Sequence, residues 1–170
     1  MFNTIRVFAS AVALVCPAGL LADDTVCSGP LSGSHDNVIV PRGAVCELRD
    51  ARLNGNVKVE QGGAVEISGR TYINGNVESE DGGRYVRIAG PGVVVGGNVQ
   101  IKYAWEASSI VSGAQIRGNL QYVENPGFLT VSDVFIRGDL QLFKNSGGAL
   151  LTDNTIRQKM QGKENYPAPP

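Results

Sequence analysis

The sequence predicts an all-β, single-domain parallel β-helix (β-solenoid), right-handed, with about seven coils of 20–22 residues. Three observations support this. A short phrase recurs at near-constant spacing, apolar residues alternate with period two around it, and glycine supplies 22 of the 170 residues. A segment of about twenty residues is too short to enclose a core, so each segment must bury its apolar face against the next.

The chain opens with a pattern typical of a secretory signal peptide. Met1 to Arg6 carries one positive charge, residues 7–21 are almost entirely apolar, and Ala22 precedes an acidic pair. We therefore expect residues 1–22 to be a leader and the protein to be secreted, periplasmic or on the cell surface; an uncleaved anchor is the alternative. The rest of the chain has no apolar run long enough to span a membrane, which predicts no transmembrane segment in the mature chain.

Two cysteines remain after the leader, Cys27 and Cys46. In an exported chain such a pair is most simply a disulfide. A metal pair is the alternative, but His35 is the only histidine that could assist it. Counting from the repeat places the two cysteines in the same column of adjacent coils, where a spacing of about 4.8 Å suits a disulfide.

The recurring phrase is an apolar residue, a polar or glycine residue, glycine, asparagine and a second apolar residue. Its copies are Leu53–Val57, Ile73–Val77, Val95–Val99, Ile116–Leu120 and Ile136–Leu140, and it fades at Ile156–Met160. The central residues follow one another at steps of 20, 22, 21, 20 and 20. An earlier copy without the glycine lies at 36–38. These positions predict a solenoid domain over residues 23–161 and a Pro-rich tail over residues 162–170 that closes the rod.

Apolar residues lie two positions before and two positions after each central residue and, in most units, also four positions after it. This alternation is typical of a strand with one buried face. Ser79 and Gly162 are the exceptions at the last of these positions. A second alternating pair, such as Val65 and Ile67, follows the glycine turn of several units. An antiparallel sandwich is the rival fold, but it requires paired hairpins rather than one constant phrase.

Stacking turns each repeated polar residue into a column. One column contains Asn56, Asn76, Asn98 and Asn119, continued by Asp139, and another contains Asn125, Asn145 and Asn165. Side-chain amides in such columns can satisfy the backbone groups that corners leave unpaired. We therefore assign both columns a structural role.

Arginines form the most suggestive column, because guanidinium groups match carboxylate and sulfate forks. The candidate ligand face comprises Arg117, Arg137 and Arg157 with Gln121, Gln141 and Gln161 on the following strand, and the aromatic residues Tyr103 and Trp105 where the repeat lengthens. A solvated outer face is the alternative for the arginines and glutamines. For the aromatic residues, which include Phe128 and Phe143, the alternative is packing over the ends of coils.

The sequence contains few candidates for catalysis. His35 has Asp36 beside it, but adjacent residues do not make a triad. Asp133 and Asp153 recur twenty apart and suit a calcium ion or an acid/base pair, although aspartate is also favoured before turns. We expect no enzyme, no cofactor and no metal site. The net charge of −1 lacks the basic footprint of a nucleic-acid-binding protein.

The leader, the cysteine-bearing first coil from Val38 to Leu48 and the Gly-Asn-Val/Leu phrases resemble small exported β-solenoid proteins of bacteria, whose function is mostly unassigned. They are also distantly similar to bactofilin-type polymer-forming solenoids, which build filaments and lack enzymatic activity. The resemblance covers most of residues 36–165 and implies an architecture rather than catalytic residues. A leader, a disulfide and a proline-ended tail depart from the bactofilin pattern, so we expect a monomer.

These observations predict a non-catalytic exported scaffold, or a surface or matrix interaction protein, whose partners are cell-surface or matrix polymers. The alternative is a carbohydrate-binding or polysaccharide-modifying β-helix protein, because many larger β-helices act on polysaccharides. The chain leaves little room for the long loops that usually build such sites.

Overall fold

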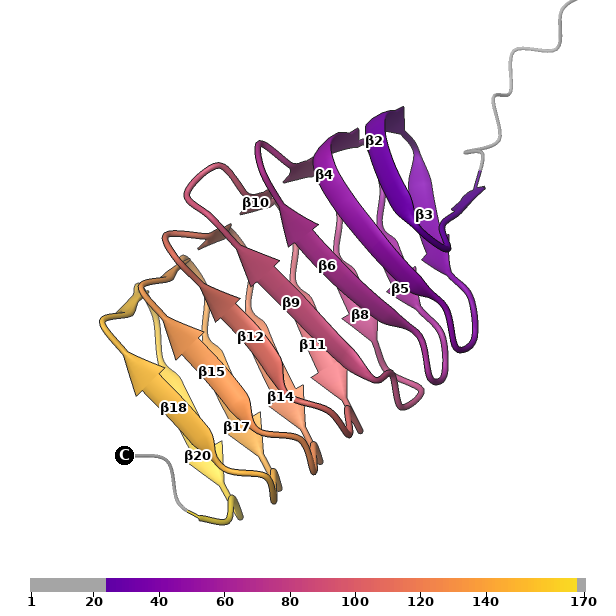
Figure 1. Cartoon of the computed structure of the whole chain (residues 1–170). Coiled ribbons are helices and arrows are strands. Elements are labelled where there is room, and N and C mark those ends of the chain that lie inside the picture. The colour runs from indigo at the N-terminus through magenta and orange to yellow at the C-terminus, as the bar shows by residue number, and fades with distance from the viewer. Residues whose placement is uncertain (1–23, 168–170) are drawn as a thin grey trace, which may run out of the picture.

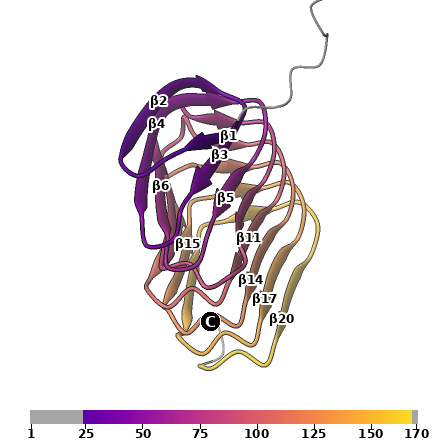
Figure 2. The same cartoon turned by 90° about the vertical axis from the view of Figure 1, so that its right-hand side faces the viewer.

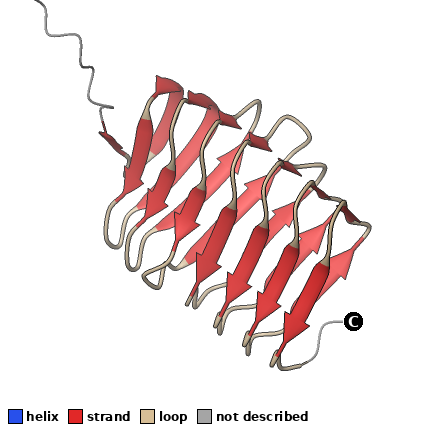
Figure 3. Ribbon diagram, turned by 180° about the vertical axis from the view of Figure 1, so that it is seen from behind, coloured by secondary structure: helices blue, strands red, loops and turns tan. Residues whose placement is uncertain are grey.

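The computed structural model describes residues 24–167, and these residues form a parallel β-solenoid of about seven turns with no helix (Figures 1 and 3). The predicted leader, residues 1–22, lies outside the described residues. Every strand pairs in parallel with its equivalents in the neighbouring coils. The predicted fold class is thus confirmed, and side chains one coil apart are direct neighbours.

Each complete coil passes through three faces. The eight-stranded sheet contains β1 (Asp24–Val26), β3 (Asn37–Val40), β5 (Val57–Val59), β8 (Val77–Ser79), β11 (Val99–Lys102), β14 (Leu120–Val123), β17 (Leu140–Phe143) and β20 (Met160–Lys163). The long strands of the twelve-stranded sheet are β2 (Pro30–His35), β4 (Val45–Leu53), β6 (Ala64–Ser68), β9 (Tyr85–Ala89), β12 (Ser108–Val111), β15 (Leu129–Ser132) and β18 (Ala149–Thr152). Its narrow strands are β7 (Tyr72–Ile73), β10 (Val94–Val95), β13 (Gln115–Ile116), β16 (Phe135–Ile136) and β19 (Thr155–Ile156).

The core is a set of apolar columns inside the coils. Val57, Val77, Val99, Leu120 and Leu140 follow one another in register along the eight-stranded sheet, and all are fully buried. Successive strand residues point to opposite faces, so alternation in the sequence becomes an apolar interior and a polar exterior. The two broad sheets face each other across this interior, which Figure 2 shows obliquely from one end.

The corner formed by the recurring phrase is held by its asparagines. The Asn98 side-chain oxygen accepts a hydrogen bond from the Asn119 backbone N–H at 2.8 Å, and Asn119 does the same for Asp139 at 2.8 Å. The pattern extends from Asn37 to Asp139, whose carboxylate accepts from the Lys159 N–H at 2.9 Å. Each coil therefore satisfies a backbone donor of the next coil, as expected for this column.

The second asparagine column is buried at the opposite end of the eight-stranded sheet. Asn125 and Asn145 donate from their amide nitrogens and backbone N–H groups to the side-chain oxygens of Asn145 and Asn165, respectively. Their amides also donate to carbonyl groups of the preceding strands. Buried polar groups need such partners, so this column stabilises the corner rather than offering a free binding site.

A left-handed residue marks the end of many broad strands. Glu124 and Lys144 follow strands of the eight-stranded sheet, with φ of 52° and 55°. Asp133 and Asp153 follow strands of the twelve-stranded sheet, with φ of 54° and 53°. Aspartate tolerates this region because its side chain forms local hydrogen bonds. This conformation is a structural reason for the recurrence of Asp133 and Asp153.

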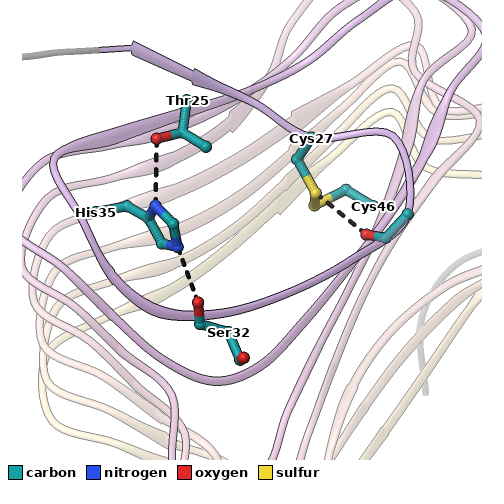
Figure 4. The surroundings of a disulfide bond; sticks show 6 residues. Thr25, Cys27, Ser32, His35 and Cys46 are labelled. Atoms are coloured by element: carbon teal, nitrogen blue, oxygen red, sulfur yellow. Dashed lines mark hydrogen bonds between the residues drawn. A yellow bond between two sulfur atoms is a disulfide. The ribbon is translucent and has the colours of Figure 1, made fainter.

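The N-terminal end of the solenoid is closed by the disulfide between Cys27 and Cys46, whose Cα atoms are 5.4 Å apart (Figure 4). The prediction that both cysteines lie in the same column of the solenoid is wrong. The N–H of Cys27 donates to Ile39 of the eight-stranded sheet, whereas Cys46 pairs with Val65 of the twelve-stranded sheet. The first coil turns sooner than the later ones, so the bridge joins the two broad sheets and both cysteines are buried.

The last described coil is more open. Met160 continues the inward column of Leu140, yet it exposes 50% of its surface because no further described strand covers it. Strand β20 continues to Lys163, beyond the predicted domain boundary at residue 161. The tail then follows the corner, where the Tyr166 N–H donates to the Asn145 carbonyl group at 2.8 Å. As far as Pro167, the tail leaves Met160 exposed rather than closing the rod.

Candidate functional site

The predicted arginine column lies at one corner of the coil. Arg117, Arg137 and Arg157 directly follow β13, β16 and β19, and all three are exposed. The Arg137 N–H donates to the Ile116 carbonyl group at 2.9 Å, and the Arg157 N–H donates to Ile136 at the same distance. The backbone therefore fixes the three arginines one coil apart.

The predicted glutamines lie just beyond this corner. Gln121 and Gln141 are paired residues of β14 and β17, and their side chains form a hydrogen bond of 3.1 Å. Gln100 extends the column by donating to Gln121 at 3.4 Å. The arginine and glutamine columns thus follow two adjoining faces, with the glycine and asparagine of the corner between them.

Tyr103 and Trp105 lie elsewhere, at the corner between β11 and β12. They expose 47% and 54% of their surfaces. Arg84 lies over the Trp105 ring, 6.0 Å from its centroid, and forms an ion pair of 3.1 Å with Glu106. The width of the eight-stranded sheet separates these aromatic residues from the arginine column, so the predicted face divides into two regions.

A hollow of about 600 Å³ lies beside Tyr103. Its lining consists of Arg42, Lys58, Glu60, Gln61, Glu80, Asp81 and Tyr103. The lining carries charges of both signs, and Lys102 approaches Glu80 to 2.6 Å at the edge of the hollow. Arg42 donates to Gln61. Several of the polar groups are therefore already paired with one another. The glycine turns at Gly62 and Gly82 were the sequence signal for this corner, but they do not reveal its hollow shape.

The largest group missed by sequence reasoning lies on the narrow strands. Arg52, Tyr72, Val94, Gln115, Phe135 and Thr155 form one outward column. The Arg52 guanidinium lies 5.1 Å from the Tyr72 ring centroid, and Arg117 lies 5.8 Å from the same centroid. In the sequence, each member of this column comes directly before the first apolar residue of a repeat phrase. The members share no residue type, so the repeat pattern did not reveal the column.

His35 has a structural role in the first coil. Its Nε2 donates to the Ser32 carbonyl oxygen at 2.9 Å, and its Nδ1 accepts from the Thr25 hydroxyl at 3.2 Å (Figure 4). The bond to Thr25 connects β1 with β2, and the bond to Ser32 lies within β2. Asp36 instead accepts from the Asn54 amide at 3.1 Å, so in this arrangement the carboxylate does not orient the imidazole.

Two tyrosines have perturbed acidity. Burial raises the pKa of Tyr85, and its hydrogen bond to Glu66 at 3.1 Å raises it further. Burial alone raises the pKa of Tyr122, which points into the core between the sheets. Both shifts favour the neutral phenol, so neither hydroxyl is activated as a base or nucleophile.

Within residues 24–167, no three histidine, cysteine, aspartate or glutamate side chains converge as metal ligands. In the same range, no helix is long and apolar enough to cross a membrane. No protein-family model matches the chain, and neither the curated proteins nor the solved structures include a match.

Proposed function

We propose that this protein is a non-catalytic exported scaffold that binds cell-surface or matrix polymers through its flat outer faces. The observation that carries this proposal is the hydrogen-bonded column of Gln100, Gln121 and Gln141 on the eight-stranded sheet. Parallel strands beneath it fix its spacing. A repeating surface of this kind suits a partner that also repeats.

The roles of the other repeated residues support a scaffold. The asparagine columns accept and donate hydrogen bonds within the corners, and the apolar columns fill the interior. These residues stabilise the rod, which leaves the outward columns as the surface for interaction. The disulfide suits an oxidising, exported compartment, where such bonds persist.

Cosedimentation with insoluble envelope and matrix fractions of the source organism tests this function. We expect the purified wild-type protein to sediment with at least one fraction. The Gln121→Ala/Gln141→Ala variant should bind at least threefold less, because it lacks the hydrogen-bonded amides. Ser109→Ala/Thr130→Ala is the matched control, since these residues occupy outward positions in two adjacent coils of the other sheet. Its binding should stay within about 1.5-fold of the wild type.

Several results would overturn the proposal. Wild-type protein that stays in the supernatant with every fraction would exclude polymer binding under these conditions. Equal losses in the two variants would show that the glutamine face has no special part. Catalytic turnover of a fraction's components, proportional to the amount of purified protein, would show that the chain is an enzyme.

A further inference from the structure

The narrow strands carry a surface that we call the arginine face. It consists of Arg52, Arg117, Arg137 and Arg157 with the aromatic rings of Tyr72 and Phe135. Arg52 and Tyr72 are register partners, and the other three arginines follow one another at the adjoining corner. The face therefore runs along the rod, across several coils.

Five of the six ion pairs of the described residues lie on other parts of the surface, and the sixth, Arg49–Asp50, lies at the edge of this face, three residues before Arg52 in the sequence. The cations that form them are Arg49, Arg84, Arg87, Lys102, Lys144 and Lys163. Within residues 24–167, no carboxylate comes within 4.0 Å of a charged nitrogen of the four arginines of the arginine face. Asp133 and Asp153 lie at the other edge of this face, four residues along the chain from Arg137 and Arg157. The charge is therefore concentrated along one edge.

Aromatic rings hold three of these four cations in defined positions. Tyr72 lies beneath two guanidinium groups, those of Arg52 and Arg117, at 5.1 and 5.8 Å from its centroid. Phe135 lies 5.6 Å from the guanidinium carbon of Arg157. A guanidinium stacked on a ring keeps its edge N–H groups free for a planar anion. Bringing like charges together on one ring costs electrostatic energy, which a bound anion would offset.

We propose that the arginine face binds a linear acidic polysaccharide that carries one carboxylate on each sugar, a polyuronate. Arg117, Arg137 and Arg157 follow one another at about one strand spacing, roughly 4.8 Å, which is comparable to the length of one sugar unit in an extended chain. Arg52 lies three coils before Arg117. Forked pairing with carboxylates gives each arginine two hydrogen bonds. Tyr72 and Phe135 offer apolar surface to the C–H faces of the sugar rings. This inference rests on the proposed function and names the class of polymer.

Calorimetry tests the inference. It measures binding of the purified protein to polygalacturonate oligosaccharides of graded length, at low and at moderate salt. We expect affinity to rise with length until the oligosaccharide spans the arginine column. Fully methyl-esterified oligosaccharides of equal length are the uncharged control and should bind at least tenfold more weakly. Affinity should also fall as salt increases, because exposed charges are screened.

Two double variants separate a defined site from general attraction. Arg117→Gln/Arg137→Gln should weaken binding at least tenfold, because it removes two adjacent forks. Arg49→Gln/Lys163→Gln changes the net charge by the same amount at side chains that are 78% and 76% exposed and do not belong to the arginine face. This control should change affinity less than threefold. Arg117→Lys/Arg137→Lys should fall between them, since lysine keeps the charge but lacks the planar fork.

Other outcomes would contradict the inference. Equal losses in the two glutamine variants would mean non-specific charge attraction. Tighter binding of a single-stranded RNA of equal charge would assign the face to a different polymer. A wild-type protein that binds no polyuronate would remove the arginine face as a site while the envelope test of the scaffold function still stood. Conversely, polyuronate binding accompanied by turnover would reject the scaffold function but keep the binding site.

Discussion

Tyr122 is, with Ser79 of the same column, a residue at which the core departs from a purely apolar stack. Its ring lies in one column with Ile101 and Leu142, and the residue is fully buried. Its hydroxyl has no hydrogen-bond partner among the described residues. The ring fills space that neighbouring coils fill with aliphatic side chains, while the oxygen loses its contact with water. A buried polar group without a partner is costly.

Replacing Tyr122 with phenylalanine should therefore stabilise the protein. We expect the free energy of unfolding to rise by about 1 kcal/mol, since the substitution keeps the ring and removes only the unpaired hydroxyl. Urea denaturation at neutral pH measures the change. Tyr72→Phe is the control: its hydroxyl is 3.4 Å from the Asn74 side-chain oxygen near the surface, so the change should stay within about 0.5 kcal/mol. A destabilised Tyr122→Phe protein would contradict the structure of this column.

The same hydroxyl makes stability depend on alkaline pH. In the unfolded chain Tyr122 has a pKa of about 10, whereas burial raises the pKa in the folded chain. Above pH 10 the unfolded state therefore binds fewer protons than the folded state, and the free energy of unfolding falls as pH rises. Below pH 10 both states keep the proton, and this group adds no pH dependence. Burial and the hydrogen bond to Glu66 give Tyr85 the same direction of change.

Urea unfolding midpoints between about pH 8 and pH 11.5 should show this decline. The Tyr122→Phe variant should show a shallower decline, because one titrating group is gone. Equal slopes for the wild type and the variant would contradict the assignment. At this scale the sequence predicted that residue 122 points inward, four positions after Gly118. The missing partner of its hydroxyl depends on neighbours from other coils, which the repeat pattern alone does not specify.

Among the elements, the corner between a narrow strand and the eight-stranded sheet is the most constant. Ile73 and Val77 flank one copy, and Ile136 and Leu140 flank another with the same separation. The corner is tight because consecutive coils touch through their backbones. A Cβ atom on Gly138 would lie 2.7 Å from the Gly118 carbonyl oxygen and would overlap the Asn119 side-chain oxygen. Glycine is needed there for this close approach.

Gly138→Ala should accordingly destabilise the protein by about 2–3 kcal/mol, because the added methyl group forces two coils apart. Gly29→Ala is the matched control, since its Cβ atom would meet nothing within 4 Å. Chemical denaturation of both variants against the wild type measures the difference. A Gly138→Ala protein as stable as the Gly29→Ala protein would show that the corner relaxes easily.

The sequence predicted this corner well because it repeats in both composition and length. It predicted the other two corners less well, since their lengths vary along the chain. That variation explains why the predicted column for Cys27 was wrong, because the first coil turns earlier than the later ones. It also hides the hollow beside Tyr103. The predicted ligand face was incomplete for a related reason: Arg52, Tyr72 and Phe135 share a column but no residue type.

For the whole molecule, the contrast between the two ends is the main feature. In a solenoid each coil contacts only its neighbours, so a coil at an end has half the support of an internal coil. At the N-terminal end, the disulfide adds a covalent link between β4 and the residue that follows β1. At the other end of the described chain, Met160, in the inward column of Leu140, remains exposed. We therefore expect the disulfide to stabilise mainly the first coils.

Replacing both cysteines with serine tests this expectation. The bridge spans 19 positions in the sequence, and a loop of this length contributes roughly 3 kcal/mol in the chain-entropy model. The double variant should lose about that much stability in urea. Hydrogen exchange should locate the loss: peptides covering β1 to β3 should exchange faster, while peptides covering β14 and β17 should keep their protection at low denaturant. Faster exchange spread evenly over all coils would mean instead that the solenoid unfolds as one unit and that the bridge supports all of it.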